Sequence, residues 1–213
     1  ALEDSLNPDR IVIGTNSKKA QETLLKLHAP LPGKRIICDM RSAQIIKYAS
    51  NSFLALKVSY ANALAIICEK TGAYIEKVLE GVGADTRIGS SYFKPGIGYG
   101  GSCLPKDINA FIAQAQRFDY NFDLLKSVDS INNGQIEKFI TKIRMALDAA
   151  DDKKVNLEGF KLAILGLSFK PNTDDIREAP SIKIIQELTN LKAQITACDP
   201  EAIKTAKKIL AQL

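Results

Sequence analysis

The residues best suited to chemistry lie between 96 and 107, in the sequence Gly-Ile-Gly-Tyr-Gly-Gly-Ser-Cys-Leu-Pro-Lys-Asp. Its closely spaced glycines allow positive φ angles and a close approach of the backbone to a ligand. Pro105 suits the first position of a helix, so Cys103 is expected just before a helix N-terminus. The partial positive charge and free N–H groups there favour a thiolate and can hold an oxyanion, and Lys106 adds positive charge nearby. We therefore interpret Cys103 as a nucleophile; the alternative is a small apolar residue in a tight turn.

This glycine run does not match either common phosphate-binding motif. The dinucleotide fingerprint is excluded because no strand precedes the run and no acidic residue on a second strand follows it. A P-loop is excluded because no Gly-Lys-Ser/Thr follows.

Two polar residues, Lys47 and Asn51, lie four positions apart in a long apolar segment and share one helix face. A lysine in such a helix needs a partner or a polar cavity, and both side chains could serve a site. The equal alternative is a lysine that extends to solvent and an asparagine that caps a neighbouring backbone group. Lys57 points elsewhere and is expected to be structural.

A second candidate loop, Phe169–Arg177, follows an expected strand at 161–166. Loops at the carboxyl ends of parallel strands bind ligands in open α/β sheets. Lys170 and Arg177 could hold phosphate there; a solvated loop is the alternative.

The elements around these loops indicate an α/β protein with a mainly helical middle. Strands are expected at 10–14 and 35–38 with a helix at 17–27 between them, so residues 1–38 resemble the tail of a Rossmann-like domain. A helix from Asp39 or Ser42 to about Lys70 is apolar on every side, which predicts burial all round, as a central spine or a subunit interface.

The second half of the chain continues with helices and ends in a βαβ unit. A short helix is expected over 75–82, another from 106, and one or two between 122 and 149 with a possible turn at 132–134. The charged run 151–154 is the best domain boundary, after which strand 161–166, helix 180–191 and strand 194–198 predict parallel pairing. The predicted domains are thus 1–38, the helical domain 39–150 with the cysteine loop, and 151–213 as the start of a second Rossmann-like domain.

Composition is that of an ordinary globular protein, with 46% hydrophobic and 25% charged residues and a net charge of +5. We expect no nucleic-acid partner, and no apolar run approaches the ~20 residues that cross a bilayer. Four scattered cysteines without a C-x-x-C pair, and a single histidine, predict no metal site, reduced thiols and a cytoplasmic setting. The first residues, Ala-Leu-Glu-Asp, lack both an initiator Met and a signal peptide and indicate a cut site.

At five motifs the sequence resembles the UDP-glucose/GDP-mannose dehydrogenase family. They are Asn7–Gly14, Ile46–Ala55, Arg87–Gly89, Gly98–Asp107 and Gly166–Lys170, in the family's order along essentially the whole chain. The resemblance implies a homodimer through the long helix and oxidation of a nucleotide sugar's C6 alcohol to the carboxylate with two NAD. Gly-Ile-Gly-Tyr before Gly-Gly-Ser-Cys indicates the UDP-glucose branch, and Ser102 argues against the N-acetyl-hexosamine branch.

The resemblance also implies a role for each candidate residue. Cys103 attacks the aldehyde-level intermediate, giving a thiohemiacetal and then a thioester. The other implied catalytic residues, which stabilise an oxyanion or order water, are Lys47, Asn51 and Asp107. The residues implied to bind the nucleotide sugar are Arg87 (across the dimer), Lys94, Gly96, Ile97, Gly98, Tyr99, Gly100, Phe169 and Lys170. Those implied near NAD are Cys103, Lys106 and Arg177.

Some expected family parts are absent from these 213 residues. They are the amino-terminal dinucleotide domain with its glycine fingerprint, a substrate-loop glutamate and a late arginine, so we expect this chain alone to be inactive. Two alternatives stay open: a GDP-mannose 6-dehydrogenase, and a non-catalytic nucleotide-sugar-binding or dimerisation module. A hydroxyacid dehydrogenase lacks the Arg/His pair that such chemistry usually needs.

Overall fold

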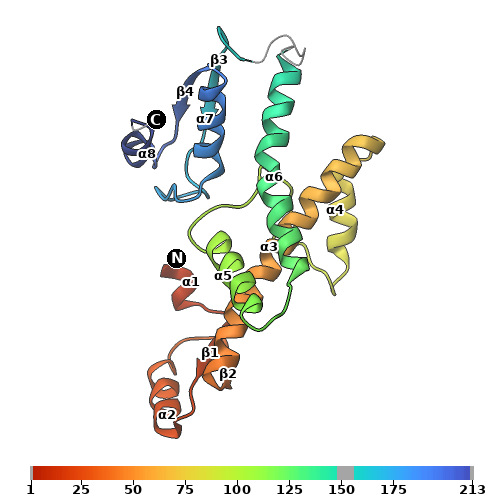
Figure 1. Ribbon diagram of the computed structural model, residues 1–213. Coiled ribbons are helices and arrows are strands. Elements are labelled where there is room, and N and C mark those ends of the chain that lie inside the picture. Colours follow the sequence, from red (N-terminus) through yellow and green to blue (C-terminus); the bar gives the residue numbers. More distant parts are fainter. Residues whose placement is uncertain (1, 148–155, 212–213) are drawn as a thin grey trace. The chain divides into compact units, whose positions relative to one another are not determined.

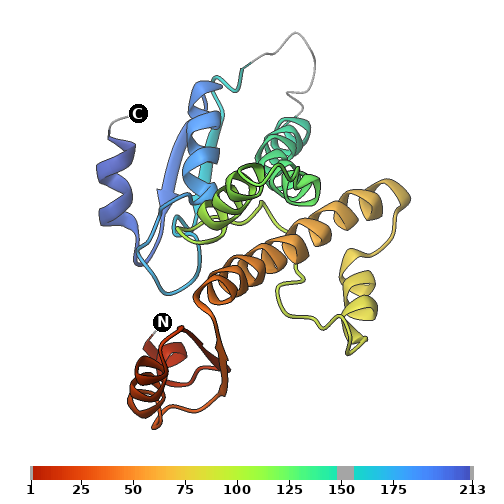
Figure 2. The same ribbon diagram turned by 60° about the horizontal axis from the view of Figure 1, so that its bottom comes forward.

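The computed structural model describes residues 2–147 and 156–211 (Figures 1 and 2). The charged run 151–154, predicted as a boundary, lies outside the described residues. Contacts divide the chain into two compact units, Ala1–Ser50 and Asn51–Leu213. The division into three domains at 38 and 150 stays a prediction.

The first unit is a short parallel βαβ arrangement. It contains α1 (Leu2–Leu6), β1 (Arg10–Gly14), α2 (Lys18–Leu27), β2 (Lys34–Cys38) and the start of α3 (Met40–Thr71). β1 and β2 pair in parallel from Arg10↔Lys34 to Gly14↔Cys38. Ser17 caps α2 by accepting a hydrogen bond from the N–H of Ala20, as expected of a serine before a helix. The predicted strands and helix are confirmed.

The long helix α3 begins after Asp39 rather than at Ser42. The Asp39 carboxylate accepts hydrogen bonds from the N–H groups of Arg41 and Ser42, which lie in the first turn and have no partner within the helix. These bonds and that of the Ser42 hydroxyl hold the pKa of Asp39 below its ordinary value.

The expectation that α3 is buried on all sides is wrong for this chain. Its buried residues include Ala55, Ser59, Ala61, Asn62 and Cys68. Phe53, Tyr60 and Ile67, in contrast, are 60%, 53% and 58% exposed. Because these three are spaced seven residues apart, they form one apolar stripe on the helix surface. Of the two interpretations of the helix, the subunit interface is the one that would cover this stripe.

By length and composition alone α3 could also cross a membrane, contrary to the sequence expectation. One such helix is weak evidence, since the core helix of a globular protein passes the same test. The polar side chains of Ser52, Ser59 and Asn62 on α3 are buried within the second unit, where they have protein surroundings.

The second unit begins with helices packed on the rest of α3. They are α4 (Ile75–Ala84), α5 (Leu104–Gln116) and α6 (Asp123–Ala146). Ala55 of α3, Ile108 of α5 and Val128 of α6 form one core cluster. α6 is continuous, so the possible turn at 132–134 is wrong: a helix tolerates Gly134 at a modest cost, and Asn132 makes tertiary contacts that favour the helical path.

The same unit ends in the predicted parallel βαβ, formed by β3 (Lys161–Leu165), α7 (Pro180–Asn190) and β4 (Gln194–Cys198), followed by α8 (Ile203–Leu210). β3 and β4 pair in parallel from Lys161↔Gln194 to Leu165↔Cys198. Leu188 of α7, which is fully buried, lies in the core cluster that also includes Ile140 of α6. The fold class, α/β with a mainly helical middle, is confirmed.

Candidate active site around Cys103

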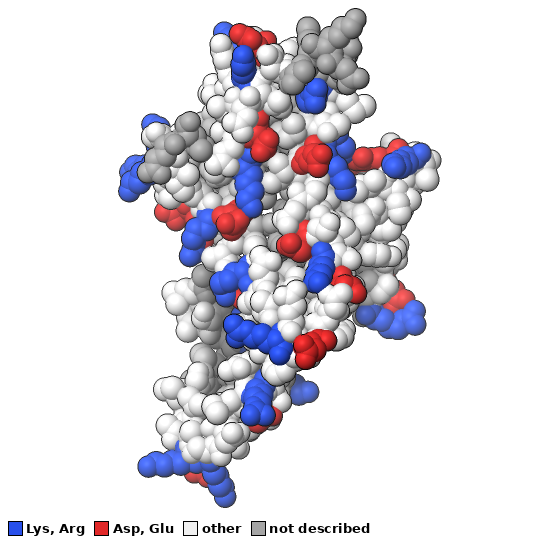
Figure 3. Space-filling view, in the orientation of Figure 1, with Lys and Arg blue, Asp and Glu red and all other residues white. Residues whose placement is uncertain are grey.

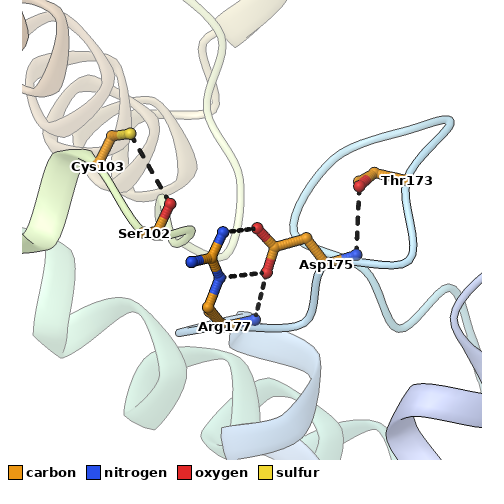
Figure 4. A network of polar contacts seen from close by, with 5 residues as sticks. All are labelled: Ser102, Cys103, Thr173, Asp175 and Arg177. Carbon is orange, nitrogen blue, oxygen red and sulfur yellow. Dashed lines mark hydrogen bonds and ion pairs between the residues drawn. The ribbon is translucent and has the colours of Figure 1, made fainter. Parts of the chain in front are cut away.

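Cys103 is the N-cap residue of α5, as the sequence predicts, with Leu104 and Pro105 as the first two helical residues. Its thiol is free and exposed. The Ser102 hydroxyl lies 3.8 Å from the Cys103 sulfur (Figure 4). The carbonyl of Cys103 accepts the helical hydrogen bond from the N–H of Asp107 at 2.9 Å. An accessible sulfur at the positive end of a 13-residue helix fits a nucleophile.

Asp107 lies one turn into α5 and is only 3% exposed. The Asn51 amide nitrogen donates to its Oδ2 at 2.6 Å, and Lys106 Nζ lies 2.5 Å from its Oδ1. A buried carboxylate needs such partners, because an unpaired charge in the protein interior is costly. The structure therefore brings together three of the predicted site residues, from α3 and α5.

Lys47 precedes Asn51 by four residues on α3 but belongs to the first unit. Its side chain is exposed, so the burial expected around the whole helix does not extend to Lys47. Its catalytic role stays a prediction.

The segment Gly96–Gly101, called the glycine loop below, packs tightly on the loop 166–179 between β3 and α7, the β3–α7 loop. The N–H of Gly101 donates to the carbonyl of Arg177 at 3.1 Å. A Cβ atom on Gly100 would lie 2.1 Å from the carbonyl oxygen of Glu178. One on Gly101, whose φ is +80°, would lie 2.7 Å from the Phe169 ring. These glycines are therefore required by contact between two protein loops.

Asn62 of α3 and Asn132 of α6 hold the glycine loop from within the helical part. Asn62 Oδ1 accepts from the N–H of Gly96 at 2.7 Å. Asn132 accepts from the N–H of Tyr99 at 2.8 Å and donates to its carbonyl at 3.2 Å. The Tyr99 ring packs on the cluster of Ala55, Ile108 and Val128, and burial raises the pKa of its hydroxyl. Sequence reasoning missed Asn132; nothing local in Asn-Asn-Gly indicates a partner 33 residues away.

On the β3–α7 loop, Asp175 holds the side chain of Arg177 in a two-pronged ion pair (Figure 4). The distances are 2.9 Å from Nε to Oδ1 and 2.6 Å from Nη2 to Oδ2. The pair lowers the pKa of Asp175 to about 2. The pKa of Arg177 is raised, first by Asp175 and more weakly by attraction to Cys103. Arg177 is thus an oriented, exposed cation.

Arg87 has a similar arrangement with Asp85, which accepts from its backbone N–H and from its guanidinium. Its side chain is 87% exposed. Lys57 donates to the carbonyls of Ile88 and Gly89 at 3.1 and 3.0 Å, which confirms a structural role for that lysine. The guanidinium of Arg87 is therefore exposed, on a turn that hydrogen bonds with Asp85 and Lys57 hold in place.

The remaining predicted residues lie near these loops. Lys94 is exposed, and Lys170 Nζ lies 5.4 Å from the centroid of the Phe169 ring. Gly96 and Ile97 also border a groove of about 810 Å³ between α3 and α6. On the face shown in Figure 3, Lys and Arg are interspersed with Asp and Glu.

The described residues do not form a complete dinucleotide site. After β3, where a phosphate would meet the backbone, the N–H groups of Leu167 and Ser168 are already bonded to Asp199 Oδ2 at 2.6 and 3.1 Å. Its Oδ1 accepts from the N–H groups of Glu201 and Ala202. Asp199 therefore joins two loops through four backbone N–H groups. Among residues 2–147 and 156–211, no cluster of three His, Cys, Asp or Glu could hold a metal ion.

Comparison with known proteins identifies the family that has this fold. Sequence models of the UDP-glucose/GDP-mannose dehydrogenase family match the chain, its central domain over residues 41–134 and its UDP-binding domain over 163–212. The chain belongs to this family.

Among its relatives, a UDP-glucose 6-dehydrogenase of Bacillus subtilis (strain 168) is 50% identical over 212 residues, 100% of this chain and 47% of the relative. A UDP-glucose dehydrogenase structure from Pyrobaculum islandicum is 37% identical with a TM-score of 0.93, covering 99% of this chain and 47% of that one. A UDP-D-ManNAc dehydrogenase structure from Pyrococcus horikoshii is 27% identical with a TM-score of 0.81, covering 93% and 46%. The chain spans about half the length of the relatives that it matches.

Proposed function

We propose that the chain is the cysteine-bearing part of an NAD-dependent UDP-glucose 6-dehydrogenase, which oxidises the C6 alcohol to UDP-glucuronate. The observation that carries the proposal is the exposed Cys103 thiol at the N-terminus of α5, beside the glycine loop and the oriented cation Arg177. NAD, when bound, supplies the hydride acceptor for both two-electron oxidations.

In this proposal Cys103 forms a covalent bond with the carbon of the aldehyde-level intermediate. The Cys103 sulfur adds to the carbonyl carbon and the oxygen takes a proton, which gives a thiohemiacetal. Loss of hydride from that carbon and of the hydroxyl proton gives a thioester. Water then adds, and the carboxylate leaves as the thiol is restored. The covalent bond to Cys103 prevents escape of the aldehyde between the two oxidations.

Neighbouring residues stabilise developing charge and position the substrate in this proposal. Lys47 and Asn51 stabilise the developing oxyanion, and Asn51 is oriented by its hydrogen bond to Asp107. Asp107 helps to order the hydrolytic water. Arg87 from a second subunit, Lys94, the glycine loop, Phe169 and Lys170 bind the nucleotide sugar. Lys106 and Arg177 would contact NAD, although the pyrophosphate cradle is not among the described residues.

We propose a homodimer through the apolar stripe of α3, because Phe53, Tyr60 and Ile67 are exposed. The four free cysteines are consistent with a reducing, cytoplasmic setting.

The test uses the protein extended to the full length of its relatives, with UDP-glucose and NAD. Cys103→Ser should reduce UDP-glucuronate formation by on the order of 10³-fold or more, because the hydroxyl is a much weaker nucleophile than the thiolate. Cys198→Ser is the matched control, since Cys198 is also free and exposed. Normal UDP-glucuronate production by Cys103→Ser would favour the alternative, a non-catalytic nucleotide-sugar-binding module. Turnover of GDP-mannose in preference to UDP-glucose would favour the GDP-mannose alternative.

A further inference from the structure

One side chain, Asn132, holds both backbone polar groups of Tyr99. Its Oδ1 accepts from the N–H at 2.8 Å, and its Nδ2 donates to the carbonyl at 3.2 Å. Asn132 is only 9% exposed, so these bonds have little competition from water. Two opposed bonds to one residue fix the peptide groups on both sides of it, as strand pairing does.

The fit between Asn132 and the loop leaves no room for another side chain. Gly98 has a φ of +99°, and a Cβ atom there would lie 3.0 Å from Asn132 Oδ1. The Tyr99 ring is meanwhile fixed in the core by Ala55, Ile108 and Val128. The middle of the glycine loop is therefore held at its backbone by α6 and at its side chain by the core.

These contacts decide which loop N–H groups remain for a ligand. The N–H of Gly96 is bonded to Asn62, that of Tyr99 to Asn132 and that of Gly101 to the carbonyl of Arg177. The N–H groups of Gly98 and Gly100 have no protein partner within the described part of the chain. From Gly98 to Gly101, amides that are available thus alternate with amides bonded to protein.

We propose that Asn132 is a positioning residue, which holds the glycine loop so that the N–H groups of Gly98 and Gly100 meet acceptor oxygens of the nucleotide sugar. The inference rests on the proposed function, which assigns the nucleotide sugar to this loop. A loop ordered in advance spares the ligand the entropic cost of ordering it, so Asn132 acts on affinity more than on bond making.

The first experiment measures UDP-glucose binding by calorimetry in full-length protein carrying Cys103→Ser, where no turnover interferes. Asn132→Leu, of similar volume, removes both hydrogen bonds and should weaken binding by about 5- to 50-fold. Asn132→Asp keeps the acceptor for the Tyr99 N–H and should give an intermediate loss. Asn133→Leu is the matched control: the exposed Asn133 bonds only to Asp129 one turn away, and affinity should not change.

The second experiment separates positioning from simple structural damage. In the otherwise unsubstituted full-length enzyme, the Asn132 variants should raise KM for UDP-glucose by the same factor, with kcat within about twofold. Amide exchange of segment 94–103 in the ligand-free protein should become faster, because the Tyr99 N–H loses its partner.

Faster exchange with unchanged affinity, or a fall in kcat at constant KM, would overturn the positioning role. No binding of UDP-glucose to the Cys103→Ser protein would overturn it as well. The expected affinity loss in a protein that never forms UDP-glucuronate would support this inference and reject the proposed function.

Discussion

Replacing Gly100 by alanine tests whether contact with the β3–α7 loop requires glycine at this position of the glycine loop. The new Cβ would stand 2.1 Å from the Glu178 carbonyl oxygen and 2.9 Å from Pro180 Cδ. Since non-bonded atoms are stable at about 3.5 Å, the two loops must separate by more than about 1 Å. The adjacent hydrogen bond, from the Gly101 N–H to the Arg177 carbonyl, would be lost or weakened.

The expected cost follows from these contacts. Overpacking of this kind costs about 1–3 kcal/mol, and a lost hydrogen bond about 0.5–1.5 kcal/mol. Alanine restricts the unfolded chain, which offsets about 0.4–1 kcal/mol. The middle values of these ranges give a net loss of unfolding free energy of about 2 kcal/mol, which lowers Tm by about 4–8 °C in a chain of this size. A 1 Å displacement beside Cys103 should also reduce kcat/KM of the full-length enzyme by about 10²-fold.

The assay is thermal unfolding followed by circular dichroism on the 213-residue chain. Gly96→Ala is the matched control, because no atom lies within 4 Å of its added Cβ and its φ is not positive. It should leave Tm unchanged or slightly raised. A Tm for Gly100→Ala equal to that of Gly96→Ala would refute the claim that the two loops pack closely at this point.

Three further predictions concern other parts of the chain. Asp199→Asn should lower Tm at neutral pH. Four backbone N–H groups hold the pKa of Asp199 below its ordinary value. The Tm difference between wild type and variant should therefore be constant above about pH 5 and shrink as the pH falls below about 4. A difference that does not depend on pH would contradict this account. Light scattering should show that either Phe53→Glu or Tyr60→Glu converts a dimer into a monomer, because each places a charge in the exposed apolar stripe of α3. A wild-type chain that is already a monomer, and that neither substitution changes, would disprove the interface. The 213-residue chain alone should form no NADH from UDP-glucose or GDP-mannose, because residues 2–147 and 156–211 do not form a complete dinucleotide site. Steady turnover that Cys103→Ser abolishes would reject that interpretation.

Local patterns in the sequence determined most of the elements. A short β-branched run predicted β1, and a short apolar run that ends at Gly166 predicted β3. Apolar residues at helical spacing, with Gly or Pro beyond them, predicted helices such as α4. Pro105 and the apolar positions after it predicted a helix behind Cys103, so the position of the thiol at a helix N-terminus was available without coordinates. These features depend on residues within one or two turns of each other, which is the range that propensity and periodicity describe.

Only the tertiary structure decided what the glycine loop touches and which face of α3 is covered. The contacts of Gly100 with Glu178 and of Tyr99 with Asn132 join residues 78 and 33 positions apart, and no local pattern encodes such pairs. The sequence Asn-Asn-Gly at Asn132 predicted a turn, because it is typical of one. In the structure α6 is a continuous helix, and the Asn132 side-chain amide bonds to the glycine loop. Burial likewise depends on what lies opposite a side chain, so an apolar sequence could not show that Lys47 and Phe53 are exposed in this chain.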